Sequence, residues 1–262
     1  TRDVEKQSPK LFSLSKLQGF CGKKFKLKPA ETLSIVQSLY EKGYVTYPRT
    51  NTEYLSENEK HTVLHLLQVH DKNNVLLFKD SKRIFDDSKI ESHSALMPTD
   101  KIANYDSFSS NEKKVYQAIF ARFNSVFWKE PCIVTETEAT IHVGRQFPND
   151  LKIKGQAIKS KGWMRVYGDD SVDKAIPLLS INQTLDVDFK PVEKKTQPPK
   201  PYTVESLGNW MVHPFKKVTD TEDDEYKALL SGCEIGTEAT RSGIIDKAIQ
   251  TGYISLTDNV YS

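Results

Sequence analysis

Residues 11–55 read LFSLSKLQGFCGKKFKLKPAETLSIVQSLYEKGYVTYPRTNTEYL, and the second half of this stretch predicts a helix, a turn and a short extended segment. Pro29 suits the first turn of a helix, and apolar residues follow it at spacings of three and four. Gly43 stands where such a helix commonly ends. The next residues are extended, and Pro48 prevents a strand from continuing. Tyr47 is therefore expected at the end of an extended segment, where its side chain can reach a groove.

Two more helices follow, and a capping box opens each of them. Ser56 and Glu59 stand three residues apart ahead of an apolar run, and so do Ser109 and Glu112. Apolar residues then recur at the three- and four-residue spacing of a buried helix face. Together with the helix described above, they predict a mostly helical unit over residues 16–130.

Beyond residue 130 the spacing of apolar residues changes to that of β-strands. From Ile133 to Val143 apolar and polar side chains alternate, which is typical of a half-buried strand. Gly, Asp and Pro separate three further strand-like runs, Leu151–Lys154, Trp163–Tyr167 and Thr184–Phe189. Residues 131–201 therefore predict an antiparallel β unit that ends in a proline-rich segment.

Residues 202–262 predict a second, smaller helical unit. Thr203 suits the cap of a short helix that contains Trp210. Another helix follows Thr237 and ends at Gly252. We expect the three tryptophans of the chain to be core residues. The chain as a whole is expected to be an α+β protein of several domains.

Composition and charge narrow the classes of function. The 262 residues are 37% hydrophobic and 27% charged, with a net charge of +2, which excludes a wholly disordered chain. No stretch approaches the ~20 apolar residues of a membrane helix. The three cysteines lie far apart, so they predict no zinc site and favour a reduced, intracellular setting.

The charge is distributed unevenly along the chain. Residues 1–50 carry ten Lys and Arg against four Asp and Glu, a local net charge of +6, whereas residues 220–225 are acidic. A basic region next to aromatic residues is consistent with a phosphate-binding face. A charged run by itself is more typical of an ordinary solvated surface.

The segment GYVTYPRT at residues 43–50 contains the strongest candidates for catalytic residues. Arg49 has a planar guanidinium suited to two-pronged contact with a phosphate. Tyr47 becomes a useful nucleophile only where nearby cations stabilise its phenolate, because the pKa of tyrosine is about 10. By itself, a Tyr-Pro-Arg turn is more often only a turn.

Four motifs of this chain resemble those of type IA DNA topoisomerases, with the topoisomerase III branch the most similar. The family's I-T-Y-P-R-T-D, which carries the nucleophilic tyrosine, appears as VTYPRTN at residues 45–51. The family's K-x-x-x-H-x-A-I-x-P-T appears as KIESHSALMPT at residues 89–99. The two others are PPKPYT at residues 198–203 and IGTEATRSGII at residues 235–245. Because all four occur in order and at suitable spacing, the chain is identified as a member of this family.

The resemblance assigns roles to individual residues. It implies that Tyr47 attacks a DNA phosphate to form a 5′-phosphotyrosyl intermediate, and that Arg49 holds the scissile phosphate. It also makes four residues DNA-binding candidates: His93, Thr237, Thr240 and Arg241. Of these, His93 matches the family histidine that contacts the DNA backbone near the cut, and Thr240 matches a hydroxyl that contacts phosphate. A structural role for His93 and a helix cap for Thr237 stay open as alternatives.

Three positions depart from the family pattern. Asn51 stands where the family often has Asp, and Ser94 where the topoisomerase III branch often has a second His. Glu234 stands where the family's form of the motif at residues 235–245 begins with Gly. None of these changes removes a residue assigned to chemistry.

Family members begin with a Toprim domain, which binds Mg²⁺ through acidic residues and supplies a glutamate and a lysine to the cleavage site. Only 46 residues precede Tyr47, and the chain begins with Thr1 rather than Met. We therefore expect a fragment without the Toprim domain, in which Mg²⁺ belongs to the absent part and no residue binds a metal. Asp186 and Asp188 are better explained as the solvated face of a strand.

The family fold implies four parts. Residues 1–15 would end a hinge segment, residues 16–130 would form the winged-helix-like domain with the tyrosine, residues 131–201 would form a β-rich hinge domain, and residues 202–262 would be part of a helical DNA-binding domain. In the family these parts form the arch of a toroid.

The implied activity is ATP-independent cleavage, strand passage and religation of single-stranded DNA by a cytoplasmic, nucleoid-associated bacterial enzyme. The isolated chain is expected to be inactive in cleavage. Two alternatives stay open: a non-catalytic module that binds single-stranded nucleic acid, and a helical nucleic-acid adaptor in which Tyr47 is only structural.

Overall fold

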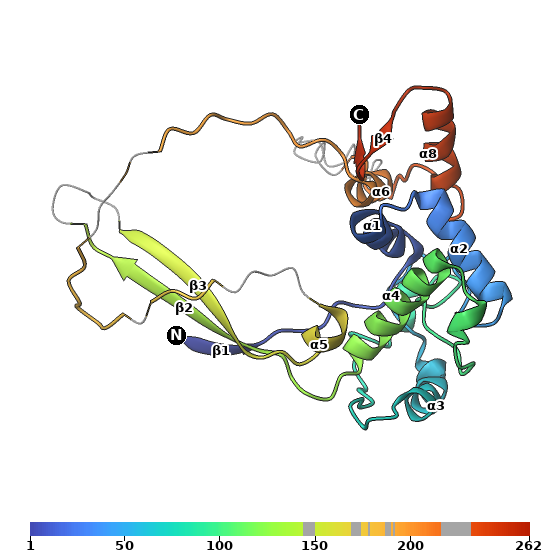
Figure 1. Ribbon diagram of the computed structural model, residues 1–262, viewed down its shortest axis with the longest axis horizontal. Helices are drawn as coiled ribbons and strands as arrows, with labels where there is room; N and C mark the ends of the chain where they lie inside the picture. Colours follow the sequence, from blue (N-terminus) through green and yellow to red (C-terminus); the bar gives the residue numbers. More distant parts are fainter. Residues whose placement is uncertain (144–149, 169–173, 178, 187–189, 191, 216–231) are drawn as a thin grey trace.

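A body of helices and a β hairpin that projects from it make up the described part of the chain (Figure 1). The structure, a computed structural model, describes residues 1–143, 150–168, 174–177, 179–186, 190, 192–215 and 232–262. The helices are α1 (Leu14–Phe25), α2 (Pro29–Glu41), α3 (Lys60–His70), α4 (Ser110–Val126), α5 (Met164–Tyr167), α6 (Val204–Val212) and α8 (Arg241–Gln250). The strands are β1 (Arg2–Glu5), β2 (Ile133–Ile141), β3 (Leu151–Ser160), β4 (Leu256–Thr257) and β5 (Val260–Tyr261). Short 3-10 turns lie at Glu57–Glu59, Asp87–Lys89 and Tyr105–Ser107.

The predicted helix over residues 29–42 is confirmed as α2, with Pro29 in its first turn. Gly43 follows with a φ of 77°, a left-handed conformation that glycine adopts without strain. Helix α1 is closed in a similar way by Lys26 with a φ of 61°, and it opens on Ser13, whose hydroxyl accepts a hydrogen bond from the Lys16 amide.

Both predicted capping boxes are present. Ser109 and Glu112 close the first turn of α4 by exchanging side-chain and backbone hydrogen bonds. Ser56 and Glu59 do the same, but the turn that they open is a 3-10 turn that leads into α3. Local sequence signals therefore define where the long helices begin.

The helical body has two apolar cores. The first joins α1, α2 and α4 and includes Phe12, Leu17, Leu39, Val115 and Tyr116. The second lies between α3 and the end of α4 and includes Leu55, Leu66, Phe85, Phe123 and Phe127. A fully buried side chain of this kind contributes about 1.5–3 kcal/mol, so these two clusters hold the body together.

The sheet has the strand order β1-β2-β3, and both pairings are antiparallel. The predicted strand from Ile133 is confirmed as β2, and β3 extends further than predicted, from Leu151 to Ser160. Strand β1 pairs with β2 from Arg2 opposite Glu136 to Glu5 opposite Ile133. The first residues of the chain therefore belong to the same sheet as the hairpin.

The predicted strand over Trp163–Tyr167 is wrong, because this segment forms the helical turn α5. The Met164 amide donates to the Lys161 carbonyl at 2.9 Å, and the Tyr167 amide donates to the Trp163 carbonyl at 3.3 Å. Trp163, Met164 and Tyr167 thereby fall on one helical face against Cys132 and Val134. Of the predicted strand Thr184–Phe189, residues 184–186 form no strand and the rest lie outside the described residues.

Residues 232–262 and α6 form a small unit with its own core. Thr203 caps α6 as predicted, and the core contains Val204, Met211, Ile245 and Tyr261. Trp210 is 40% exposed, so its expected place in a core is wrong. Trp210 lies on the face of α6 that points away from this core, and its ring centroid is 6.0 Å from that of Tyr202.

Helix α6 packs closely on α1. A Cβ at Gly22 would lie 3.1 Å from the Cβ of Val204 and 2.5 Å from Oδ1 of Asn259. Glycine at this position lets the two segments approach each other. This contact joins the small C-terminal unit to the helical body that carries the segment 43–50 (Figure 1).

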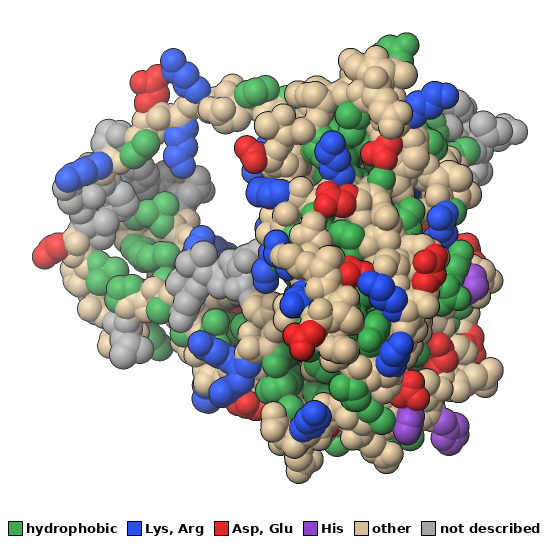
Figure 2. Space-filling model, turned by 45° about the vertical axis from the view of Figure 1, so that its right-hand side comes forward, with side chains coloured by type: hydrophobic (Ala, Val, Ile, Leu, Met, Phe, Trp, Pro, Cys, Tyr) green, Lys and Arg blue, Asp and Glu red, His purple; other side chains and the backbone are tan. Residues whose placement is uncertain are grey.

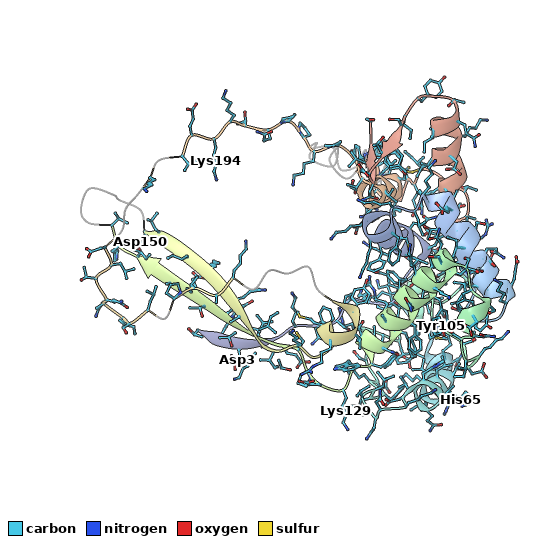
Figure 3. The ribbon with its side chains drawn as sticks, in the orientation of Figure 1. Asp3, His65, Tyr105, Lys129, Asp150 and Lys194 are labelled. Atoms are coloured by element: carbon cyan, nitrogen blue, oxygen red, sulfur yellow. The ribbon has the colours of Figure 1, made fainter. Side chains whose placement is uncertain are left out.

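The hairpin reaches far from the helical body, with Asp150 and Lys194 at one end of the molecule and His65 and Tyr105 at the other (Figure 3). Figure 2 shows an opening between the helical body and the remote part of the chain, with Lys and Arg side chains on its border. Among the described residues, none of the helices is long and apolar enough to cross a membrane. The predicted α+β architecture is confirmed.

Candidate active site

The backbone before Tyr47 is fixed by pairing with residues 96–99. Val45 pairs with Pro98 in an isolated antiparallel bridge, and the Thr46 amide donates to the Met97 carbonyl at 3.0 Å. Val45 is 1% exposed. Tyr44 is buried as well, with its ring edge-on to that of Phe108 at 4.7 Å. Of the extended segment predicted ahead of Pro48, the structure has one bridge residue, Val45, with a bend on either side, and its buried side chain anchors the segment.

The phenol ring of Tyr47 is half-buried between two other rings. The His93 ring lies 4.4 Å from it at a tilt of 47°, and the Tyr40 ring meets it edge-on at 5.5 Å. His93 itself is exposed. Two predicted site residues, Tyr47 and His93, thus lie together although 46 positions separate them in the sequence.

Arg49 reaches the C-terminal motif. Its Nη1 donates to the Ala239 carbonyl at 3.4 Å. The Thr50 hydroxyl donates to the His93 carbonyl at 2.9 Å, and the Thr50 carbonyl accepts from the Leu14 amide at 2.9 Å. Residue 50 therefore holds the loop after Tyr47 against both the His93 segment and the start of α1.

Thr237 and Thr240 are exposed and close a tight turn ahead of α8. The Thr237 carbonyl accepts from the amides of Thr240 at 2.9 Å and Arg241 at 3.0 Å. The Thr240 hydroxyl accepts from the Thr237 amide at 2.8 Å. The two hydroxyl groups stand 3.1 Å apart on the surface, beside the residue that Arg49 contacts.

Arg241 points into the protein rather than toward solvent. The residue is 6% exposed, and its guanidinium pairs with the carboxylates of Glu234 and Glu238, the latter at 2.6 Å. Its Nε also donates to the Ile235 carbonyl at 3.3 Å. The guanidinium predicted to bind DNA is thus engaged by protein groups in this structure, and it organises the turn instead of facing the surface.

Two residues that the sequence analysis did not assign lie in the same region. Tyr40 packs against Tyr47 from the last turn of α2. Glu238 is largely buried, and burial raises the pKa of its carboxyl group, although the Ser15 amide and Arg241 oppose this shift. Tyr40 belongs to the apolar residues of the predicted helix over residues 29–42, and Glu238 belongs to the motif at residues 235–245.

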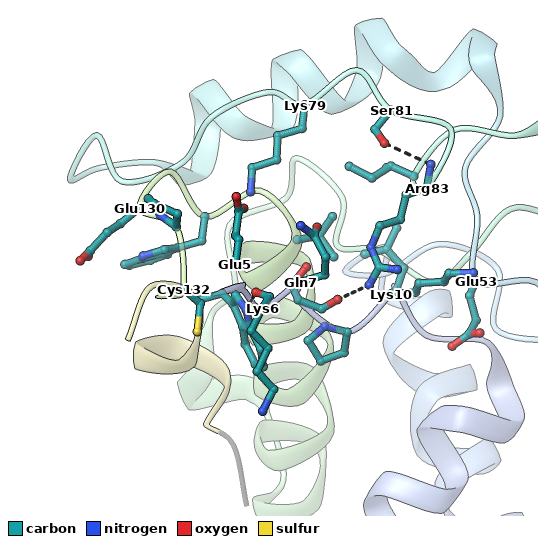
Figure 4. Close-up of a pocket in the computed structure, with 18 residues that line it drawn as sticks. Glu5, Lys6, Gln7, Lys10, Glu53, Lys79, Ser81, Arg83, Glu130 and Cys132 are labelled. Atoms are coloured by element: carbon teal, nitrogen blue, oxygen red, sulfur yellow. Dashed lines mark hydrogen bonds between the residues drawn. The ribbon is translucent and has the colours of Figure 1, made fainter. Parts of the chain in front are cut away.

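A pocket lies away from Tyr47, at the junction of the sheet and the helical body (Figure 4). It is a cavity of about 80 Å³ between residues 5–11, 79–84 and 128–132. Burial lowers the pKa of Lys79 there. None of the six predicted site residues lines it, so it plays no part in the site around Tyr47.

Comparisons with known proteins show the family to which the chain belongs. A family model described as DNA topoisomerase matches residues 1–261. The DNA topoisomerase 1 of Alkalihalophilus pseudofirmus is 32% identical over 264 residues, which cover 97% of this chain and 36% of the relative. The DNA topoisomerase 3 of Bacillus licheniformis is 30% identical over 265 residues, with 93% and 36% covered. The chain therefore spans about a third of the length of these relatives.

The fold has a solved counterpart. The full-length topoisomerase I of Thermotoga maritima matches with a TM-score of 0.65 and 18% identity, over 99% of this chain and 41% of that chain. At this identity the match is evidence for the fold alone, and it supports the predicted arch. The relatives carry the names topoisomerase 1 and topoisomerase 3, so they do not separate the two branches. The family model, which extends over nearly all the residues, shows that the chain belongs to the type IA DNA topoisomerases.

Proposed function

We propose that the protein containing these 262 residues cuts one DNA strand with Tyr47, lets another strand pass, and reseals the first without ATP. The observation that carries this proposal is the meeting of three distant segments at the loop of Tyr47 and Arg49. The ring of His93 lies against that of Tyr47, and Arg49 contacts Ala239 in the turn of Thr237 and Thr240, 190 positions further along the chain.

In the proposed reaction the Tyr47 Oη attacks the scissile phosphorus. An Oη–P bond forms as the P–O3′ bond breaks, so the 5′-phosphate stays on the tyrosine and the 3′-oxygen leaves as a hydroxyl group. The phenol loses one proton, and the leaving oxygen gains one. Religation is the reverse attack by the 3′-hydroxyl, and the phosphotyrosyl bond conserves the energy that resealing needs.

Arg49 and His93 are proposed to act on the phosphate. A guanidinium is a strong donor to phosphoryl oxygens and offsets the charge that builds up on them. An imidazole can donate to such an oxygen in either charge state. We propose Thr237 and Thr240 as contacts to the flanking backbone, because their exposed hydroxyl groups stand beside the Arg49 contact.

A single strand is the proposed substrate. The Tyr47 ring is half-buried between the rings of His93 and Tyr40, so a flexible strand can bring its phosphate to the phenol more readily than a stiff duplex. The exposed aromatic pair Tyr202 and Trp210 also suits unstacked bases.

Mg²⁺ is the ion that the family implies. Within the described ranges, three or more His, Cys, Asp or Glu side chains nowhere come together as a metal site would need, so these residues do not fit the ion. Mg²⁺ would therefore bind to a Toprim domain of the same protein, outside these residues.

The four-part division at residues 15, 130 and 201 also remains a proposal. The pairing of β1 with β2 supports it, since residues 2–5 thereby join the sheet rather than the helical body. The bacterial relatives support a place of action on DNA in the bacterial cytoplasm.

The test uses the full-length protein that carries this chain, with a single-stranded oligonucleotide and Mg²⁺. We expect an SDS-stable protein–DNA adduct and its loss in Tyr47→Phe. Tyr253→Phe is the matched control, because Tyr253 is 84% exposed and the same hydroxyl is removed elsewhere. DNA binding without an adduct in the unmodified protein would favour the non-catalytic binding module instead.

A further inference from the structure

We infer that Glu238 is a positioning residue that docks the C-terminal turn onto the first turn of α1 and so completes the site around Tyr47. The inference rests on the proposed function for its catalytic consequence, but the docking contact can be tested without any reaction. It is carried by a set of contacts between three segments of the chain.

The first contact is the bond from α1 to Glu238. The Ser15 amide donates to Glu238 Oε1 at 2.5 Å. Ser15 lies in the first turn of α1, where backbone N–H groups have no acceptor within the helix and the helix dipole favours a negative charge. Glu238 therefore satisfies a donor that α1 cannot satisfy by itself.

The second contact fixes the carboxylate from the other side. Glu238 Oε2 accepts from Arg241 Nη1 at 2.6 Å, and Arg241 is buried with Glu234 as its other acidic partner. Both oxygens of Glu238 are thus engaged. The side chain cannot turn away from Ser15 without leaving Arg241 with one carboxylate fewer.

Further contacts connect α1 and the C-terminal turn to the loop after Tyr47. Leu14, which precedes Ser15, donates its amide to the Thr50 carbonyl at 2.9 Å. Arg49, which precedes Thr50, donates to the carbonyl of Ala239, and Ala239 follows Glu238. The start of α1, the loop after Tyr47 and the C-terminal turn are therefore linked in pairs, and Glu238 supplies a charged group to the contact with α1.

Neighbouring contacts show that the turn and α1 meet over a polar surface. Gln18, one turn further along α1, donates from Nε2 to Ser242 Oγ at 3.4 Å, and both residues are buried. Polar contacts of this kind depend on exact geometry more than apolar packing does. Loss of the Glu238 bond is therefore expected to loosen the position of Ala239 under Arg49.

Glu234 provides a matched control. It pairs with the same guanidinium of Arg241 as Glu238 does, but among the described residues it makes no hydrogen bond or ion pair with α1. Glu238→Ala removes the Arg241 contact and the Ser15 contact, whereas Glu234→Ala removes only an Arg241 contact. A difference between the two variants isolates the link to α1.

The first measurement is hydrogen exchange of the Ser15 amide by NMR on the full-length protein without DNA. We expect Glu238→Ala to raise its exchange rate at least about tenfold, because this amide has no other acceptor among the described residues. Glu238→Gln should fall between, since a neutral amide oxygen still accepts, and Glu234→Ala should leave the rate unchanged. The Lys16 amide, capped by Ser13, serves as the internal reference.

The second measurement is DNA cleavage by the full-length protein. We expect Glu238→Ala to lower the cleavage rate about ten- to a hundredfold with little change in affinity for single-stranded DNA, and Glu238→Gln to restore part of it. Unchanged Ser15 exchange in Glu238→Ala would overturn the docking contact. Equal loss of cleavage in Glu234→Ala would overturn the positioning role. If Tyr47→Phe still cleaved, the proposed function would fail while the exchange result stood.

Discussion

Arg49 Nη1 lies 3.4 Å from the carbonyl oxygen of Ala239, a residue 190 positions further along the chain. This contact joins the loop after Tyr47 to the turn that carries Thr237 and Thr240. A site assembled in this way depends on the packing of α6 and α8 against α1 and α2 as much as on the residues that touch DNA. The predictions below test that packing and the ring contacts of Tyr47.

The close approach of α1 and α6 depends on Gly22. In Gly22→Ala the new Cβ would meet Asn259 Oδ1 at 2.5 Å and the Cβ of Val204 at 3.1 Å. We expect a loss of about 1–3 kcal/mol in the free energy of unfolding, despite the better helix propensity of alanine. Urea denaturation followed by circular dichroism measures it.

Gly208→Ala is the control for this change. Gly208 lies within α6, and a Cβ there meets nothing within 4 Å, so we expect a gain of up to about 1 kcal/mol. A gain of stability in Gly22→Ala as well would show that the two helices do not approach each other as described.

The Tyr40 ring is predicted to hold the Tyr47 ring in place. Tyr40→Phe keeps the edge-on ring contact, whereas Tyr40→Ala removes it. We expect near-normal DNA cleavage in the first variant and a several-fold lower rate in the second, with DNA affinity similar in both. Single-turnover assays on the full-length protein measure these cleavage rates. A cleavage rate as low in Tyr40→Phe as in Tyr40→Ala would mean that the Tyr40 hydroxyl group, not its ring, is needed.

The low pKa of the Glu112 carboxyl group predicts that this residue's contribution to stability depends on pH. The Lys42 ammonium holds the pKa of this carboxyl group at about 2, with help from the Ser109 amide and from the Ser38 and Ser109 hydroxyl groups. A depressed pKa stabilises the fold above the ordinary value of 4.5, and the contribution is lost as the pH falls from there toward 2. Glu112→Gln should therefore cost about 1–3 kcal/mol at pH 7 and progressively less in acid.

Thermal unfolding at several pH values measures this dependence. Glu193→Gln removes the same charge from an exposed position and is the control. A loss of stability in Glu112→Gln that stayed constant from pH 7 to pH 3 would rule out the proposed ionisation.

Local signals made much of the helical body predictable. The capping boxes at Ser56 and Ser109 and the Pro29 start of α2 act over a few residues, so the sequence contains the whole of their cause. The alternation from Ile133 identified β2 for the same reason. The strand predicted over residues 163–167 is wrong because so short a run of mostly apolar residues fits a strand and a helical turn equally well.

The site residues show the limit of this reasoning. The motifs named Tyr47, Arg49 and His93, but only the folded chain reveals that Arg49 meets Ala239 and that the His93 ring lies on that of Tyr47. The family motif makes Arg241 a DNA-binding candidate, whereas in the structure its guanidinium lies inside the protein. Its burial depends on Glu234 and Glu238, whose approach follows from tertiary packing.

The identity of the nucleophile is the central claim. The most direct test is to trap the covalent complex of the full-length protein with a single-stranded oligonucleotide, digest it with a protease, and identify the modified peptide by mass spectrometry. We expect one adduct, a 5′-phosphate joined to Tyr47, with a free 3′-hydroxyl on the other DNA product. An adduct on any other residue, or a phosphate left on the 3′ side, would contradict it.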